Sequence, residues 1–156
     1  MTDEDSTPQQ ASATVNAEAA GNDPERARIG KLLYEEITQS IIAAFYAVYN
    51  KLGYGFLENV YCAALAFELS RRGHKVAREV TVPVFYDGVQ IAKYRVDFLV
   101  DDVVMLEVKS TAMLNPSDER QLLNCLRATP LEVGLLLHFG PKPKFQRIVA
   151  SRKPSR

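Results

Sequence analysis

The chain lacks any uncharged apolar run that approaches the roughly 20 residues needed to cross a bilayer as a helix. It also lacks, near its N-terminus, the basic stretch followed by an apolar stretch that is typical of a secretory signal. These two absences argue against a membrane protein and a secreted protein. We therefore expect a cytoplasmic protein with no membrane partner.

Cysteine and histidine are scarce, with two of each in 156 residues. Cys62 and Cys125 are isolated and show neither the CxxC nor the Cys/His spacing that a zinc site needs. His74 and His138 also have no partner at metal-binding spacing, so we expect them at the surface or at a strand end and not in catalysis. The sequence predicts two ordinary buried thiols and no zinc site.

The balanced net charge conceals an asymmetry along the chain. Residues 1–28 hold six acidic and two basic side chains, and the remainder holds 13 acidic and 17 basic ones. Because residues 1–28 also contain almost no large apolar side chain, we expect a disordered acidic tail there. A single domain is expected over residues 29–150, followed by a basic tail at 151–156. The mildly basic domain permits phosphate binding without demonstrating it.

Apolar residues at a spacing of 3.6 predict two helices in the first half of the domain. The first covers residues 31–52 and ends before Gly53. The second ends before Gly73, behind two arginines. Its predicted apolar stripe consists of Leu57, Val60, Tyr61, Ala64, Leu65 and Leu69.

The pattern then changes to that of strands. Residues 75–86, 89–100 and 103–110 are rich in Val and are separated by turn sequences at Asp87-Gly88 and Asp101-Asp102, which predicts an antiparallel three-strand meander. Pro83 fits an edge position in the first strand. A helix should begin at Asn115-Pro116 and run to about residue 128. The apolar run 131–139 indicates a strand buried on both faces, and 144–150 a short edge strand. This order predicts an α/β fold.

Three charged residues of the predicted meander are expected to lie close together. Side chains alternate across a strand, so Glu107 and Lys109 share one face while Val108 points to the other. The hairpin at Asp101-Asp102 brings Asp97 close to Glu107 on the neighbouring strand. Two carboxylates and one ammonium group are therefore expected together at one edge of the sheet.

Magnesium is one reason for such a cluster, because it prefers oxygen ligands and usually takes one or two carboxylates together with water and phosphate. Asp97 and Glu107 would be ligands, and the Val108 carbonyl a third. Lys109 would lie beside the attacking water or the scissile phosphate and offset developing negative charge. Glu58 of the second helix would complete the cluster by binding metal or water.

The alternative interpretation is a solvated sheet face on which Asp97, Glu107 and Lys109 form surface salt bridges, since an Asp followed at a distance by ExK is a pattern of low information. The context favours the metal site. Glu107 and Lys109 directly follow the apolar run 103–106, in a strand expected at the middle of the sheet.

A longer motif precedes this cluster: Gly53-Tyr54-Gly55-Phe56-Leu57-Glu58-Asn59-Val60-Tyr61. With Asp97, Glu107-Val108-Lys109 and Gln121-Leu122-Leu123-Asn124 following in order, the chain resembles the GxxExxY protein family, a branch of the PD-(D/E)XK nuclease superfamily, over about residues 31–149. The resemblance implies a restriction-endonuclease-like core of helix, three-strand antiparallel meander, helix and strand, with an extra N-terminal helix.

The resemblance also implies roles for individual residues. Glu58 would be the helix-borne acid, Asp97 and Glu107 metal ligands, Lys109 the catalytic lysine, and Gln121 a polar residue of the next helix that approaches the site. Four residues after that glutamine the family pattern expects an aromatic residue, usually Tyr, and this chain has Cys125. The departure removes any role for that ring and leaves the metal ligands in place.

The hypothesis is therefore hydrolysis of phosphodiester bonds in nucleic acid, DNA or RNA, with Mg²⁺ or Mn²⁺. Two basic groups would flank the substrate in such a nuclease, although for each group taken separately a solvated surface is the slightly favoured interpretation. They are Arg71, Arg72, Lys75, Arg78, Lys93 and Arg95, and then Lys142, Lys144 and Arg147. The alternative hypothesis is a non-catalytic scaffold that keeps the nuclease fold and works through a protein partner.

Overall fold

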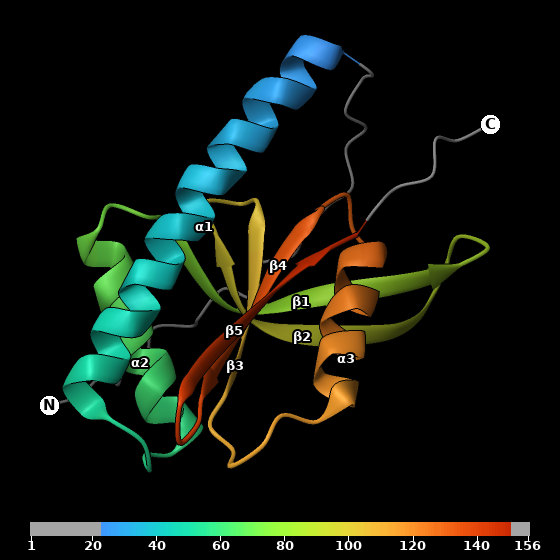
Figure 1. Ribbon diagram of the computed structural model, residues 1–156. Coiled ribbons are helices and arrows are strands. Elements are labelled where there is room, and N and C mark those ends of the chain that lie inside the picture. The colour runs from blue at the N-terminus through green and yellow to red at the C-terminus, as the bar shows by residue number, and fades with distance from the viewer. Residues whose placement is uncertain (1–22, 151–156) are drawn as a thin grey trace, which may run out of the picture.

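The structure is a computed structural model that describes residues 23–150 (Figure 1). Its elements, in chain order, are α1 (Pro24–Leu52), α2 (Glu58–Arg71), β1 (Val76–Tyr86), β2 (Val89–Val100), β3 (Val104–Lys109), α3 (Pro116–Arg127), β4 (Val133–Phe139) and β5 (Pro143–Val149). In this part of the chain, no helix is long and apolar enough to cross a membrane.

The five strands form one sheet in the order β1-β2-β3-β4-β5. Neighbouring strands are antiparallel except β3 and β4, which are parallel and joined through α3. The predicted meander, helical crossover and final edge strand are all confirmed. Pro83 lies in β1, an edge strand, where a residue without an N–H group costs the sheet least.

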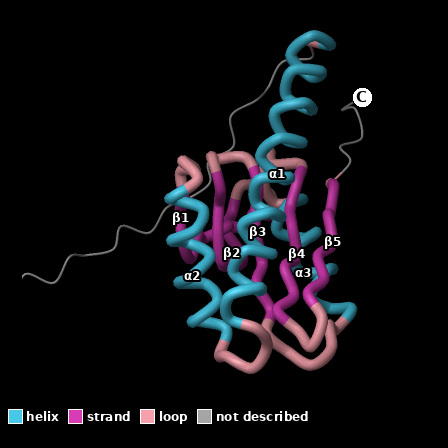
Figure 2. Tube along the Cα trace, turned by 60° about the vertical axis from the view of Figure 1, so that its left-hand side comes forward, coloured by secondary structure: helices cyan, strands magenta, loops and turns pink. Residues whose placement is uncertain are grey.

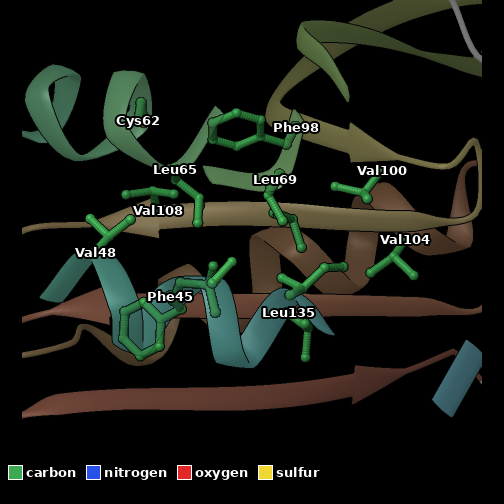
Figure 3. Close-up of a cluster of buried hydrophobic side chains, with 14 of the residues drawn as sticks. Phe45, Val48, Cys62, Leu65, Leu69, Phe98, Val100, Val104, Val108 and Leu135 are labelled. Carbon is green, nitrogen blue, oxygen red and sulfur yellow. The ribbon is translucent and has the colours of Figure 1, made fainter. Parts of the chain in front are cut away.

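Helices cover both faces of the sheet, with α1 and α2 on one face and α3 on the other (Figures 1 and 2). This arrangement gives two apolar cores. In the first, Phe45 and Leu65 pack against alternate residues of the strands, such as Leu135 (Figure 3). In the second, Leu122 and Leu126 of α3 pack on the opposite side chains of the sheet. Every residue of β4 is buried, as expected for a strand covered on both faces.

The first helix begins earlier than its apolar pattern predicts. It starts at Pro24, seven residues before the expected position, because the side chain of Asp23 accepts a hydrogen bond from the Glu25 N–H and proline suits the first helical turn. The predicted boundary between residues 28 and 29 therefore falls inside α1. Residues 1–22 and 151–156, the rest of the predicted tails, lie outside the described residues.

The predicted apolar stripe of α2 is only partly correct. Tyr61, Leu65 and Leu69 are buried in the first core. Leu57 and Val60 are exposed, because Leu57 is the N-cap before the helix begins and Val60 lies on the side of the first turn that faces away from the sheet. The two helix ends agree with the prediction, with Gly73 in a left-handed conformation after α2.

His74 is not a lone surface residue. Its Nδ1 lies 2.6 Å from Asp101 Oδ2 and its Nε2 lies 2.7 Å from Ser40 Oγ, so the ring joins the middle of α1 to the turn between β2 and β3. The order of groups is that of a Ser-His-Asp triad. Ser40 is inside a continuous helix, however, where backbone N–H groups already bond to preceding carbonyl groups, so none is free to stabilise an oxyanion. The contact is structural.

The hydrogen bonds at the start of α3 should stabilise the fold. Asn115 accepts a hydrogen bond from the Ser117 N–H, and Asp118 accepts one from the Asn115 N–H, which forms a reciprocal capping box. Asn115→Ala should lower the free energy of unfolding by about 1 kcal/mol, measured by urea denaturation. The control Ser117→Ala, at an exposed position of the same turn, should change it by less than about 0.5 kcal/mol. Equal losses in the two variants would contradict the role of the cap.

Candidate active site

The pairing of β2 with β3 stops at Asp97. Regular pairs run from Val100–Val104 to Phe98–Leu106, and beyond them side chains replace backbone groups. The Val108 N–H donates to Asp97 Oδ2 at 2.7 Å, and the Asp97 N–H donates to Glu107 Oε1 at 3.2 Å. Each of the two predicted carboxylates is thus held by the backbone of the neighbouring strand. Asp97 therefore lies inside β2 and marks the end of the ladder between β2 and β3.

The sheet is irregular at the same point. Phe98 and Val100 contribute to the core under α1 and α2, whereas Val96 contributes to the core under α3, although even spacing along a regular strand keeps residues on one face. Opposite Asp97, Glu79 of β1 adopts a left-handed conformation with φ of 53°, which is unfavourable for a residue other than glycine. Both strands therefore switch faces beside the carboxylate pair.

Glu107 is a buried carboxylate, with only 7% of its surface exposed. Burial, and then repulsion by Asp97, raises the pKa of Glu107 to about 8, against the opposing effect of Lys109. A buried carboxylate beside a second, half-buried one attracts a proton or a cation. The prediction that the strand hairpin brings Asp97 and Glu107 together is borne out by their hydrogen bonds.

Lys109 lies at the end of β3 and on the same face as Glu107, two residues away. Its Nζ is 3.9 Å from Oδ1 of Asp118 in the first turn of α3. Among the described residues, no salt bridge joins Lys109 to Asp97 or Glu107. This arrangement disagrees with the alternative of a solvated, salt-bridged sheet face, because α3 covers that face and Glu107 is buried.

Glu58 is the first residue of α2 and lies beside the pair. Burial, and then repulsion by Asp97, raises the pKa of Glu58, while the charge of Lys109 lowers it. The start of α2 therefore lies near the charges of Asp97 and Lys109. In the described residues, no set of three or more His, Cys, Asp and Glu side chains is placed to hold one metal ion. Glu58 is therefore a neighbour of the Asp97 and Glu107 pair in this structure and does not form a three-carboxylate cage with it.

Gln121 and Cys125 lie on successive turns of α3. Gln121 is exposed, one turn after Asp118. Cys125 is buried in the core under α3, as predicted, and its burial, followed by the charge of Glu107, raises the pKa of its thiol to about 12. Cys62 is also buried, and burial raises the pKa of its thiol to about 12. Neither thiol is activated as a nucleophile.

Near the site, Asp118 was missed in the sequence, and the expectation for His138 was only partly correct, because it lies close to a strand end but is buried. Asp118 contacts Lys109, and its position three residues after a capping Asn was the available signal. His138 is Lys109's partner in the parallel register of β4, and it is buried. Its Nε2–H donates to the Thr111 carbonyl at 2.6 Å, which holds the loop after β3, while its Nδ1 has no hydrogen-bond partner among the described residues.

The first basic group is largely neutralised. Arg71 and Arg72 bind Glu68 of their own helix, Lys75 binds Asp102, and Arg95 lies 3.9 Å from Glu79. These contacts favour the interpretation of a solvated surface. Arg78 differs, because its guanidinium carbon lies 5.5 Å from the centre of the Phe98 ring, next to Asp97 in the sequence.

The donor set fits a hard divalent cation. Asp97 and Glu107 each use one oxygen to accept a backbone hydrogen bond, and the second oxygen of each has no hydrogen-bond partner in the described part of the chain. Carboxylate oxygens are the ligands that Mg²⁺ and Mn²⁺ prefer. A cation between them would relieve the repulsion that raises the pKa of Glu107.

The family model of the PD-(D/E)XK nuclease superfamily matches residues 35–148 of the chain. No curated protein matches the sequence significantly. Among solved structures, the crystal structure of SSO0001 is similar with a TM-score of 0.50 and 19% identity, over 78% of this chain. The chain spans 62% of the length of SSO0001, and at this identity the likeness shows the fold alone.

In the absence of metal, the buried Glu107 should make the free energy of unfolding depend on pH. Because its pKa is about 8 when folded and about 4.3 in an unfolded chain, its protonation stabilises the fold below about pH 4, and this stabilisation is lost as the pH rises to about 8. Glu107→Gln cannot ionise. In EDTA its free energy of unfolding should exceed that of the wild type increasingly between about pH 4 and 8, by an amount on the order of a few kcal/mol.

The measurement is urea denaturation at several pH values. Glu119→Gln, which changes an exposed carboxylate on α3, is the matched control and should follow the wild type throughout. A Glu107→Gln curve parallel to the wild type at all pH values would show that Glu107 does not titrate in this range.

Proposed function

Because the chain belongs to the PD-(D/E)XK nuclease superfamily, we propose that it hydrolyses phosphodiester bonds of nucleic acid with the help of a divalent metal ion. The single observation that carries the proposal is the Asp97 and Glu107 pair, fixed by reciprocal backbone hydrogen bonds. A merely structural pair would gain nothing from leaving an oxygen of the buried Glu107 without a hydrogen-bond partner.

We place the chain in the GxxExxY branch of the superfamily, since the motif has a physical purpose here. Gly55 has a φ of 119°, which shapes the loop before α2. Tyr61 is buried, and its hydroxyl donates to the Gly53 carbonyl at 2.5 Å, which ties that loop to the helix. Glu58 lies three residues before Tyr61, nearly one helical turn, at the start of the helix and near the charge of Asp97.

Asp97, Glu107 and the Val108 carbonyl are the proposed metal ligands, with Glu58 as an additional ligand or a binder of metal-bound water. When bound, Mg²⁺ or Mn²⁺ would supply a Lewis acid for the phosphate and a more acidic water. The hydrogen bonds from the backbone of Val108 and Asp97 orient the two carboxylates before any ligand arrives. Such preorganisation removes the cost of arranging the ligands during the reaction.

Lys109 is the proposed catalytic cation. Its ammonium group would lie beside the phosphate and offset the negative charge that develops in the transition state. Asp118 limits where that group can go, through a contact loose enough, at 3.9 Å, to let it turn to a substrate. Gln121, exposed one turn further along α3, would contribute a polar contact to the nucleic acid.

The roles of Glu107 and Lys109 can be separated by mutation. Glu107→Gln removes a ligand charge, so affinity for Mn²⁺ should fall at least about tenfold together with cleavage. Lys109→Ala removes a cation close to the metal, so Mn²⁺ affinity should persist or increase while turnover falls about 10²- to 10³-fold. Calorimetric titration with Mn²⁺ and a cleavage assay on the same preparations would measure both effects.

The cleavage assay uses labelled single-stranded and double-stranded DNA and RNA in Mg²⁺ or Mn²⁺, with Asp97→Ala as the inactive reference. Glu119→Gln and Lys93→Ala are the matched controls, because each removes one charge, as Glu107→Gln and Lys109→Ala do, but at an exposed position. Both should retain metal affinity and activity. If the wild type binds no divalent ion at millimolar concentration, and neither site variant alters metal affinity, the scaffold hypothesis replaces the nuclease.

A further inference from the structure

Exposed apolar side chains gather beside the carboxylate pair. In the loop between α1 and α2, Tyr54 is 48%, Phe56 47% and Leu57 75% exposed. Met113, in the loop between β3 and α3, is 82% exposed. Exposed apolar side chains that gather in this way, and are not scattered singly, are typical of an interaction site.

Two contacts place these two loops together at the site. Tyr61, which holds the segment 54–57 through the Phe56 N–H, stacks on Phe139 at the end of β4 with ring centres 4.3 Å apart. The His138 Nε2–H donates to the Thr111 carbonyl, which ties the loop carrying Met113 to the same end of β4, and β4 lies parallel beside β3. Both loops therefore border Asp97, Glu107 and Lys109. They lie at the carboxyl end of β3, which is where ligands bind in sheets with parallel strands.

The Phe56 ring is held in place. Its edge packs on Tyr61, with ring centres 6.1 Å apart at 85°, and the Phe56 N–H donates to the Tyr61 hydroxyl at 3.3 Å. Since Tyr61 is itself buried, Phe56 presents a fixed ring with nearly half of its surface open. A fixed aromatic ring loses little entropy when a flat ligand stacks on it.

Positive charge lies next to the apolar surface. The hydroxyl of Tyr49, in the last turns of α1, donates to the carbonyls of Gly140 and Pro141 at 2.9 Å each. Gly53, four residues later, begins the apolar loop and bonds back to Tyr49. The turn after β4 is therefore adjacent, and it carries the exposed Lys142. Lys142 in this turn and Lys109 at the end of β3 are therefore the cations nearest to the apolar loop in the chain segments that border it.

We propose that the substrate is a nucleic-acid strand with unpaired bases, which stack on Phe56 and Tyr54 while the backbone phosphates meet Lys142 and Lys109. In a duplex, base faces are covered by their neighbours and cannot reach a protein ring, whereas unpaired bases can. Exposed rings beside cations are the arrangement that single strands require. The inference rests on the proposed function, since it names the substrate class of the same site.

The absence of tryptophan from the sequence allows a direct test. Phe56→Trp introduces a single tryptophan on the surface, and base stacking quenches its fluorescence. Phe67→Trp is the control, because Phe67 is also exposed on α2 but lies about 13 Å along the helix from Glu58, and the cation over its ring, Arg71, is paired with Glu68. Tyr54→Trp is a second reporter in case Phe56→Trp does not fold. Each is titrated, in EDTA and low salt, with 12-residue DNA or RNA strands and with the matching duplexes.

We expect single strands to quench the tryptophan at position 56 or 54, at concentrations at least about fivefold below those needed with duplex. The tryptophan at position 67 should not be quenched. The DNA and RNA arms tell which sugar is preferred. Quenching that is equal with duplex, equal at position 67, or absent at both 56 and 54 would overturn the proposal and point to a protein partner for this surface.

A second comparison separates stacking from general apolar contact. Phe56→Leu should weaken the binding of a labelled single strand at least about fivefold, and Phe56→Tyr should retain it. Equal affinities of the two variants would also overturn the proposal. These measurements involve no cleavage, so they separate this inference from the proposed function. If the protein binds single strands but cleaves nothing, only the proposed function is refuted. If it cleaves duplex and shows no stacking, only this inference is refuted.

Discussion

Two hydrogen bonds, from the Val108 N–H to Asp97 and from the Asp97 N–H to Glu107, hold β2 and β3 together where their regular ladder ends. They replace backbone pairing by side-chain pairing, so the strands can part without leaving buried N–H groups unsatisfied. The same bonds fix two acidic groups between the strands. Structure and site therefore depend on one interaction, and the sheet cannot be regular there without losing the carboxylate pair.

Holding these carboxylates costs stability, as the raised pKa of Glu107 indicates. The left-handed Glu79 on the neighbouring strand adds backbone strain at the same level of the sheet. Packing elsewhere offsets both. Every residue of β4 is buried between helices on two faces, and α1, α2 and α3 close the cores on either side. Strain concentrated beside a cluster of acidic groups is typical of a functional site.

Local signals in the sequence account for most of the fold. The turn at Asp101-Asp102, where both residues adopt positive φ, was evident from residue type, as was the capping Asn115 before Pro116. Errors occurred where a local signal was overlooked or a contact was remote. The Asp23-Pro24 start of α1 is a local signal of the kind used for α3. The link from His74 to Ser40 and Asp101 joins residues up to 34 positions apart, which no periodicity reveals.

The sequence by itself determined which residues alternate on β3, that a hairpin brings Asp97 near Glu107, and that the chain resembles a nuclease family. These follow from short-range geometry, because strand alternation and a tight turn fix the neighbours of each residue. Only the tertiary structure decided that Glu107 is buried beneath α3, that Lys109 meets Asp118, and that Leu57 and Phe56 stay exposed beside the site. Burial and charge contacts depend on which distant element covers a residue, and that is set by the packing of the whole chain.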